Sequence, residues 1–236
     1  MTKHSQNGFG RLCWCAALLG LALAGCMNVT PPSGKSEDFE HSSDRPPSAR
    51  TLYSMARVMV AQGQDDQAKF VLARVLHVHP DFVPAYCAMA ELQMRARHVD
   101  EAMETLSDGL KIAPQDAILH NDVGLCRVMK KDYGVALKEF TSATALAPAD
   151  SRYRGNMAMA LGMLGRYEES VELYKQIMPE SDAHFNLAVI CEARDDTAKA
   201  GEEYKQAKVL HDRADKAKGG ASTGGAVSSN GPVEKG

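Results

Sequence analysis

The segment Val83–Asp116, VPAYCAMAELQMRARHVDEAMETLSDGLKIAPQD, is repeated in outline along most of this 236-residue chain. Pro114, near its end, has counterparts 34 residues away on either side, at Pro80 and Pro148. The repeated segments are rich in Ala, Leu, Met, Glu, Lys and Arg, which form helices readily, and a fixed period of this length is typical of stacked helical hairpins. The sequence therefore predicts an all-α repeat architecture.

Small residues recur at two positions of each unit, where a large side chain would hold two helices apart. The first set is Ala56, Ala90, Gly124 and Ala158, and the second is Ala68, Ala102, Ala136 and Ser170. A larger residue follows four positions after each member of the second set, at Leu72, Leu106, Phe140 and Tyr174. These spacings predict closely packed helix pairs with a bulky residue filling the space between them.

The pattern resembles the tetratricopeptide repeat family over residues 49–210. The resemblance implies a right-handed superhelical solenoid of about five helix-turn-helix units. The predicted units are residues 49–82, 83–116, 117–150, 151–180 and 181–210, and the fourth is short because Pro179 comes early. One unit alone buries too little apolar area to fold, so stacking of neighbours is expected to supply the core.

In this family the first helices of the units line a groove that holds a segment of a partner protein. Carrying the groove positions over to this sequence gives an expected partner-binding set: Tyr53, Arg57, Met94, Leu125, Val128, Met129, Met159, Met163, Phe185 and Val189. We expect an apolar middle that suits an amphipathic helix or an extended apolar segment, although some of these residues could be core instead. The basic clamp with which some relatives hold a carboxyl terminus is absent, since Ile118 and Asp122 stand at two of its positions.

Residues 1–25 resemble the signal peptide of bacterial lipoproteins, with a positively charged start and an apolar stretch, residues 12–23, too short to span a bilayer. The letters LAGC at residues 23–26 resemble a lipobox, which implies that Cys26 is lipidated and anchors the mature chain to a membrane. The alternative is an ordinary signal peptide followed by a cysteine that occurs there by chance.

Residues 26–48 and 211–236 are poor in apolar residues, and we expect the first to be a disordered tether and the second a disordered tail. Met27 and Asn28, rather than aspartate, follow the lipobox cysteine. By resemblance to other lipoproteins this implies the periplasmic face of the outer membrane, with the inner membrane or the cell surface left open.

Several function classes are disfavoured. A net charge of −3 without a basic stripe argues against nucleic-acid binding. The chain has no phosphate-binding loop, nucleophile elbow or zinc-protease motif, so we expect no enzyme activity, no cofactor and no small-molecule substrate. His77 and His79 are too few for a metal site.

The three cysteines of the expected folded body, Cys87, Cys126 and Cys191, are interpreted as small apolar fillers. A disulfide between Cys87 and Cys126 is the alternative.

The run NMAMALG at residues 156–162 with Gly165-Arg166-Tyr167 is similar to the TadD group of lipoproteins from tight-adherence (Flp) pilus systems. That resemblance implies a pilotin-like scaffold that binds a secretin or another pilus or secretion component. Two other roles stay open: a component of outer-membrane barrel assembly, and an adaptor for periplasmic peptidases or cell-wall hydrolases.

Overall fold

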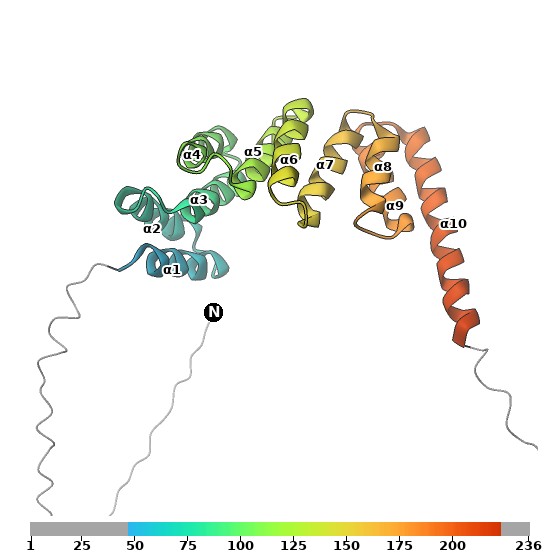
Figure 1. Ribbon diagram of the computed structural model, residues 1–236, viewed down its shortest axis with the longest axis horizontal. Coiled ribbons are helices and arrows are strands. Elements are labelled where there is room, and N and C mark those ends of the chain that lie inside the picture. Colours follow the sequence, from blue (N-terminus) through green and yellow to red (C-terminus); the bar gives the residue numbers. More distant parts are fainter. Residues whose placement is uncertain (1–46, 223–236) are drawn as a thin grey trace, which may run out of the picture. The chain divides into compact units, whose positions relative to one another are not determined.

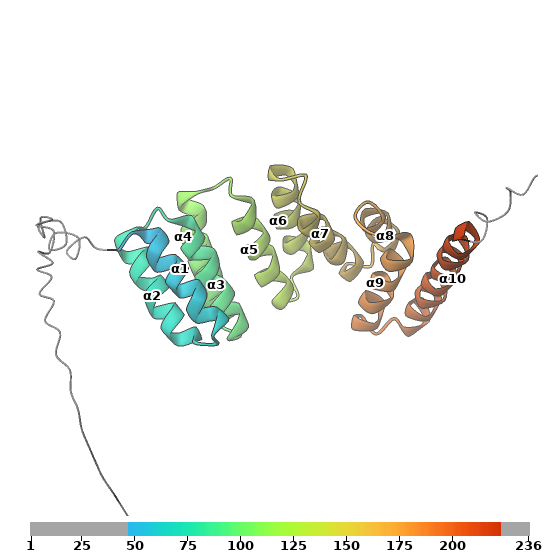
Figure 2. The ribbon, with the colours of Figure 1, turned by 90° about the horizontal axis from the view of Figure 1, so that it is seen from below.

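The computed structural model describes residues 47–222. All regular secondary structure in that range is α-helix (Figures 1 and 2). The helices, in chain order, are α1 (Ala49–Ala61), α2 (Asp65–Val78), α3 (Val83–Arg95), α4 (Val99–Ile112), α5 (Ala117–Met129), α6 (Tyr133–Leu146), α7 (Ser151–Met163), α8 (Tyr167–Lys175), α9 (Glu180–Ala193) and α10 (Thr197–Ser222). The expected signal peptide, Cys26 and all but the last two residues of the expected tether lie outside the described residues, as do residues 223–236.

Each helix packs against the next one along the chain, and the first helices of neighbouring units also touch, as α3 with α5 and α7 with α9. The helices form five pairs that stack into a solenoid, which confirms the predicted fold class. No described helix is both long enough and apolar enough to cross a membrane.

The recurring small residues lie where the helices of a unit meet. Ala56 and Ala68 are almost completely buried in the first unit, and Ala90 and Ala102 are fully buried in the second. The bulky positions are filled as predicted, with Leu72, Leu106 and Phe140 fully buried and Tyr174 nearly so. Burying a leucine or phenylalanine side chain contributes about 1.5–3 kcal/mol, so these repeated positions supply a steady share of the core.

The turn inside each unit has a left-handed residue at the same position of the repeat. These residues are Gly63 (φ 74°), Arg97 (65°), Lys131 (61°), Gly165 (81°) and Asp195 (62°). In the third unit, for example, the backbone N–H of Asp132 donates to the carbonyl oxygen of Arg127 at 2.9 Å, and that of Lys131 donates to Val128 at 2.8 Å. These two hydrogen bonds end the first helix of the unit and give two of its last backbone carbonyl groups a partner.

The fourth unit is shortened in its second helix. α8 has nine residues, whereas α2, α4 and α6 have 14 each. Pro179 lies four residues after the end of α8 and has an extended backbone immediately before α9. A proline has no backbone N–H to continue a helix that comes before it.

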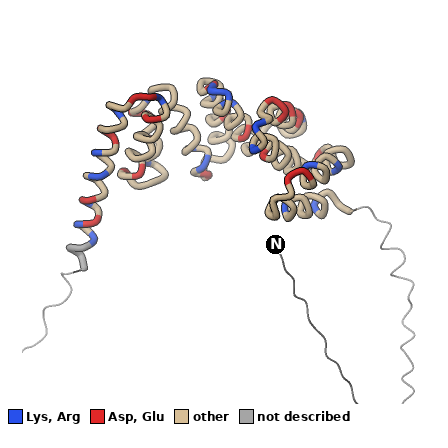
Figure 3. Tube along the Cα trace, turned by 180° about the vertical axis from the view of Figure 1, so that it is seen from behind, with Lys and Arg blue, Asp and Glu red and all other residues tan. Residues whose placement is uncertain are grey.

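The prediction of a disordered tail from residue 211 was wrong for residues 211–222, which continue α10. Residues 211–218 are an exposed part of this helix, in which acidic and basic side chains are interspersed (Figure 3). A helix already formed by packing, here at Ala200 and Ala207, extends at little cost through Ala, Lys and Arg residues. Low apolar content therefore did not prevent order here.

Candidate functional site

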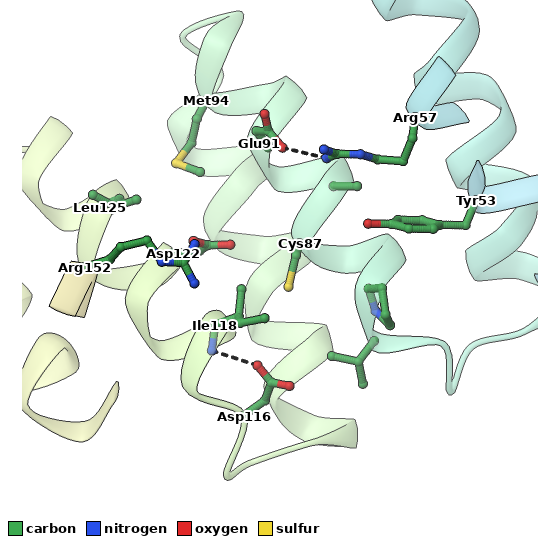
Figure 4. Close-up of a pocket in the computed structure, with 13 residues that line it drawn as sticks. Tyr53, Arg57, Cys87, Glu91, Met94, Asp116, Ile118, Asp122, Leu125 and Arg152 are labelled. Atoms are coloured by element: carbon green, nitrogen blue, oxygen red, sulfur yellow. Dashed lines mark hydrogen bonds and ion pairs between the residues drawn. The ribbon is translucent and has the colours of Figure 1, made fainter. Parts of the chain in front are cut away.

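A cavity of about 410 Å³ opens between α1, α3, α5 and the start of α7 (Figure 4). Its lining comes mainly from the first helices of three successive units: Tyr53, Arg57, Val83, Pro84, Cys87, Ala88, Glu91, Met94, Asp116, Ile118, Asp122, Leu125 and Arg152. The 34-residue repeat brings them together, because equivalent helices of neighbouring units face the same side of a stacked solenoid.

Four of the ten residues expected to bind a partner line this cavity: Tyr53, Arg57, Met94 and Leu125. Tyr53 is held by an edge-to-face contact with Phe82, whose ring centroid lies 5.5 Å away. Four members of the predicted set thus form one continuous surface.

The other six residues lie elsewhere. Val128, Met129, Met159 and Met163 are half-buried, and Met159 packs against two buried clusters, one around Phe140 and one around Tyr174. Phe185 and Val189 are exposed on α9, by 53% and 44%. Phe185 also contacts the ring of Tyr204 on α10, at 5.5 Å between centroids.

The lining is more charged than the sequence predicted, because five ionisable carboxylate and guanidinium groups reach the cavity: Arg57, Glu91, Asp116, Asp122 and Arg152. We expected an apolar middle from the Met, Leu and Val residues of the register. Asp116 and Asp122 were not in the predicted set. In the sequence analysis, Asp122 was considered only as a position of the absent basic clamp. The repeat register places that position in the groove, so it could have predicted Asp122 as a groove residue.

Most of these charges already have partners. Arg57 pairs with Glu91 at 3.4 Å between Nη1 and Oε2, and both side chains are about half exposed. Arg152 forms a two-pronged pair with Asp150, with the closest contact at 2.6 Å. Such exposed pairs hold side-chain positions but contribute little to stability.

Asp116 has a structural role at the start of α5. Its Oδ1 accepts hydrogen bonds from the backbone N–H groups of Ile118 and Leu119, at 2.9 and 3.0 Å. An aspartate in this place satisfies N–H groups that a helix leaves without partners at its beginning. Its carboxylate is therefore committed to the helix.

Asp122 is different, since its carboxylate makes no ion pair within the described residues. Desolvation by burial raises the pKa of this carboxyl to about 6, and the negative charges of Glu91 and Asp116 add to the rise. A hydrogen bond from Asn121 Nδ2, at 3.1 Å, and the charge of Arg152 lower the pKa in part. Asn156 of the next unit fixes Asn121 by donating to its Oδ1 at 2.7 Å.

The three cysteines within the described residues, Cys87, Cys126 and Cys191, are free thiols. Burial raises the pKa of Cys87 to about 12 and that of Cys126 to about 11, with the charge of Asp122 adding to both. The alternative of a Cys87–Cys126 disulfide is therefore not what the structure contains.

Among the described residues, no group of three or more His, Cys, Asp or Glu side chains is arranged to hold a metal ion.

A second concave surface lies on the outer side of the first unit, away from this cavity. It has a volume of about 540 Å³ and includes Met55, Met59 and Phe70. Phe70 is 74% exposed. In the second unit Met89, the counterpart of Met55, is buried in the cluster of the first unit, whereas Met55 is 50% exposed because no unit precedes it among the described residues.

Comparison with known proteins agrees with the repeat pattern. Residues 71–121 match a family model described as tetratricopeptide repeat, and residues 50–81 match a second model with the same description. The two models together cover residues 50–121, and the later helix pairs, from α5 to α10, continue the same stacked arrangement. Repeats of this kind generally act as non-enzymatic scaffolds for protein–protein interaction, and neither matching model describes a catalytic family.

Solved structures share the fold at low sequence identity. They include MamA residues 41 to the end from Desulfovibrio magneticus RS-1 (17% identity, 71% of this chain and 97% of that one, TM-score 0.57). A tetratricopeptide repeat protein from Parabacteroides merdae ATCC 43184 is also similar (16% identity, 74% and 70%, TM-score 0.60). So is YrrB, described as a TPR protein with an unusual peptide-binding site (17% identity, 74% and 90%, TM-score 0.55). No curated protein matches the chain.

Proposed function

We propose that this protein is a lipid-anchored scaffold of the bacterial cell envelope that holds a segment of a partner protein while an envelope machine is assembled. The machine is a tight-adherence (Flp) pilus or a related secretion system, and the role is pilotin-like. The observation that carries the binding role is the cavity between α1, α3 and α5, where Tyr53, Met94 and Leu125 give apolar surface beside charged groups.

The occupant is a peptide segment rather than a small metabolite. The cavity is an open trough built from three parallel repeat units, so an extended or helical segment can cross several units at once. YrrB, which shares the fold, is described as having a peptide-binding site. Apolar and methionine side chains accommodate different partner shapes, and the charged groups select among them.

The anchoring and the machine rest on sequence patterns. The LAGC letters at residues 23–26 place a cysteine where lipoproteins are acylated, and two or three acyl chains give stable membrane attachment. The run at residues 156–162 is similar to pilus-assembly lipoproteins of the tight-adherence type. An anchored scaffold searches a small volume, which raises the effective concentration of its partner.

A crosslinked pull-down of the tagged protein from membranes, with mass spectrometry, tests the partner. The matched control is Ile118→Trp, which fills the cavity from a residue that is 48% exposed and so leaves the core intact. A secretin or pilus component that is enriched with the wild type and lost with Ile118→Trp supports the proposal. Barrel-assembly proteins or a hydrolase with the same dependence would replace the pilus role and keep the scaffold.

Membrane anchoring has its own test. Cys26→Ser should move the protein from the membrane fraction to the soluble fraction of broken cells, and metabolic labelling with a palmitate analogue should be lost in parallel. An unchanged membrane fraction together with unlabelled wild-type protein would exclude lipidation at Cys26.

A further inference from the structure

We infer that, where a partner segment occupies the groove as proposed above, it presents a lysine or arginine side chain to Asp122, with apolar residues on either side of that basic residue.

The first observation is an imbalance of charge within the cavity. Arg57 forms an ion pair with Glu91, and Arg152 forms one with Asp150. The carboxylate of Asp116 accepts hydrogen bonds from the backbone at the start of α5. The remaining carboxylate, Asp122, makes no ion pair among the described residues. It accepts a hydrogen bond from Asn121, and the charge of Arg152, which is paired with Asp150, offsets its own charge only in part. A cation from outside would complete the pairing of the cavity.

The second observation is where Asp122 lies. It points into the cavity from α5, while Tyr53 points toward it from α1 on the opposite side (Figure 4). Desolvation and the neighbouring negative charges keep its pKa at about 6, so at neutral pH the cavity holds a charged carboxylate at a cost in free energy. A hydrogen-bonded cation removes that cost, and charge-assisted bonds of this kind are about twice as strong as neutral ones.

The third observation is the shape of the surroundings. Met94, Leu125 and Ile118 border the same cavity, and they give the methylene stem of a lysine or arginine an apolar wall while its charged end reaches Asp122. The open form of the cavity admits a side chain carried by a longer segment. An acidic partner segment is disfavoured because the carboxylate of Asp122, which has no ion-pair partner among the described residues, would repel it.

Selection from a random peptide library displayed on phage tests this inference. We expect peptides selected by the full-length wild type to carry Lys or Arg at one fixed position, at least about tenfold above the unselected library, which corresponds to about 1.4 kcal/mol. Asp122→Asn should remove this preference. Glu104→Gln, an exposed carboxylate on α4 outside the cavity, should retain it.

The cavity-filling variant separates the two proposals. If the selected peptides bind Ile118→Trp as well as the wild type, they do not occupy the groove, and both the proposed function and this inference fail. If their binding is lost with Ile118→Trp but they lack basic residues, the groove binds peptides and only the inference is overturned. A basic preference that survives in Asp122→Asn also overturns it. Circular dichroism of each variant establishes that it is folded.

A pH series gives a second readout with a selected lysine peptide and the same peptide carrying norleucine. The groups facing Asp122 are Tyr53 and Arg57 on α1, Cys87 and Glu91 on α3, Asp116 before α5, and Arg152 on α7. Between about pH 7.5 and about pH 5, the lysine peptide should bind about tenfold more weakly, because Asp122 becomes protonated. The norleucine peptide, and both peptides with Asp122→Asn, should not change. Equal weakening of the lysine peptide in Asp122→Asn would overturn the inference.

Discussion

Gly124 on α5 faces the ring of Phe140 on α6 so closely that a Cβ at residue 124 would lie 2.5 Å from Phe140 Cε1. The first two units have alanine and leucine at the corresponding positions, as Ala56 with Leu72 and Ala90 with Leu106. The third unit therefore fits a larger ring by removing a methyl group from the facing helix. The two substitutions compensate in volume within the same helix pair.

Gly124→Ala is expected to destabilise the protein by about 1–3 kcal/mol, because the added methyl forces the buried Phe140 ring to move. Phe140→Leu alone should also destabilise, since it leaves a void. The double variant recreates the pairing of the first two units and should be more stable than the sum of the single effects by about 0.5–3 kcal/mol. Urea unfolding of the four proteins measures this coupling, and strictly additive effects would contradict the volume argument.

Substitutions at two equivalent left-handed turn positions, Gly63 and Lys131, are expected to change the stability in opposite directions. Gly63→Ala places a side chain at φ 74° with no other atom within 4 Å of the new Cβ, so it should cost about 1 kcal/mol from backbone strain alone. Lys131→Gly relieves the same strain at φ 61° and should stabilise by up to about 1 kcal/mol. Thermal unfolding reports both. A lower melting temperature for Lys131→Gly would show that the Lys131 side chain outweighs its strain.

We expect the contribution of Asp122 to the free energy of unfolding to increase as the pH falls. Its pKa is about 6 in the folded protein and 3.8 in the unfolded reference, so the folded state holds the proton more tightly. The contribution of this group to folding therefore improves as pH falls from about 6 to about 4, and above pH 6 its charge is a constant cost. Asp122→Asn should raise the free energy of unfolding by roughly 1–3 kcal/mol near neutral pH, an advantage that disappears near pH 4.

The measurement is urea unfolding of wild type and Asp122→Asn at several pH values. Glu104→Gln is the matched control and should leave the curve unchanged, because this glutamate is exposed. A variant less stable than the wild type at neutral pH would show that the Asp122 carboxylate is satisfied in the free protein. That result would also weaken the case for a basic partner residue.

The thiols are expected to react slowly in the folded protein. Burial raises the pKa of Cys87 to about 12, so near pH 8 very little thiolate is present, and iodoacetamide should modify it at least about 100-fold more slowly than in urea. Cys87 is only partly buried, whereas Cys126 is fully buried and should be protected more strongly. Mass spectrometry of alkylated peptides over time measures both rates. Rapid labelling of Cys87 in the native protein would mean that the cavity opens to a more polar state.

Much of the fold could be predicted because close packing leaves a record in the sequence. Ala68, Ala102 and Ala136 recur at 34 residues for the physical reason that two helices touch there, and the structure buries all three. At Gly63 and Gly165 the residue type is consistent with the left-handed backbone of the turn, because glycine adopts it without strain. At Arg97, Lys131 and Asp195 the same backbone is imposed by the stacked helices, and residue type gave no sign of it.

The candidate site was predicted only in part. Helical register placed Tyr53, Arg57, Met94 and Leu125 on the inner side of the stack, and the structure brings them to one cavity. Register alone did not separate that surface from the core, so Met159, which packs between buried clusters, was grouped with them. α10 also extends beyond residue 210, where the sequence predicted that the folded part ends. Composition indicates how much apolar area a segment can bury, but it does not account for the low free-energy cost of extending a helix that has already formed.

The sequence by itself determined the repeat, the number of units, the helix pairs and the shortened fourth unit, because each depends on local spacing of small residues, prolines and glycines. Only the tertiary structure decided which charges meet. Arg57 and Glu91 are 34 residues apart and pair across two units, whereas Asp122 is left without an ion pair among the described residues. Burial and neighbouring charge, which arise only when units stack, turn an ordinary aspartate into a carboxyl with a pKa of about 6.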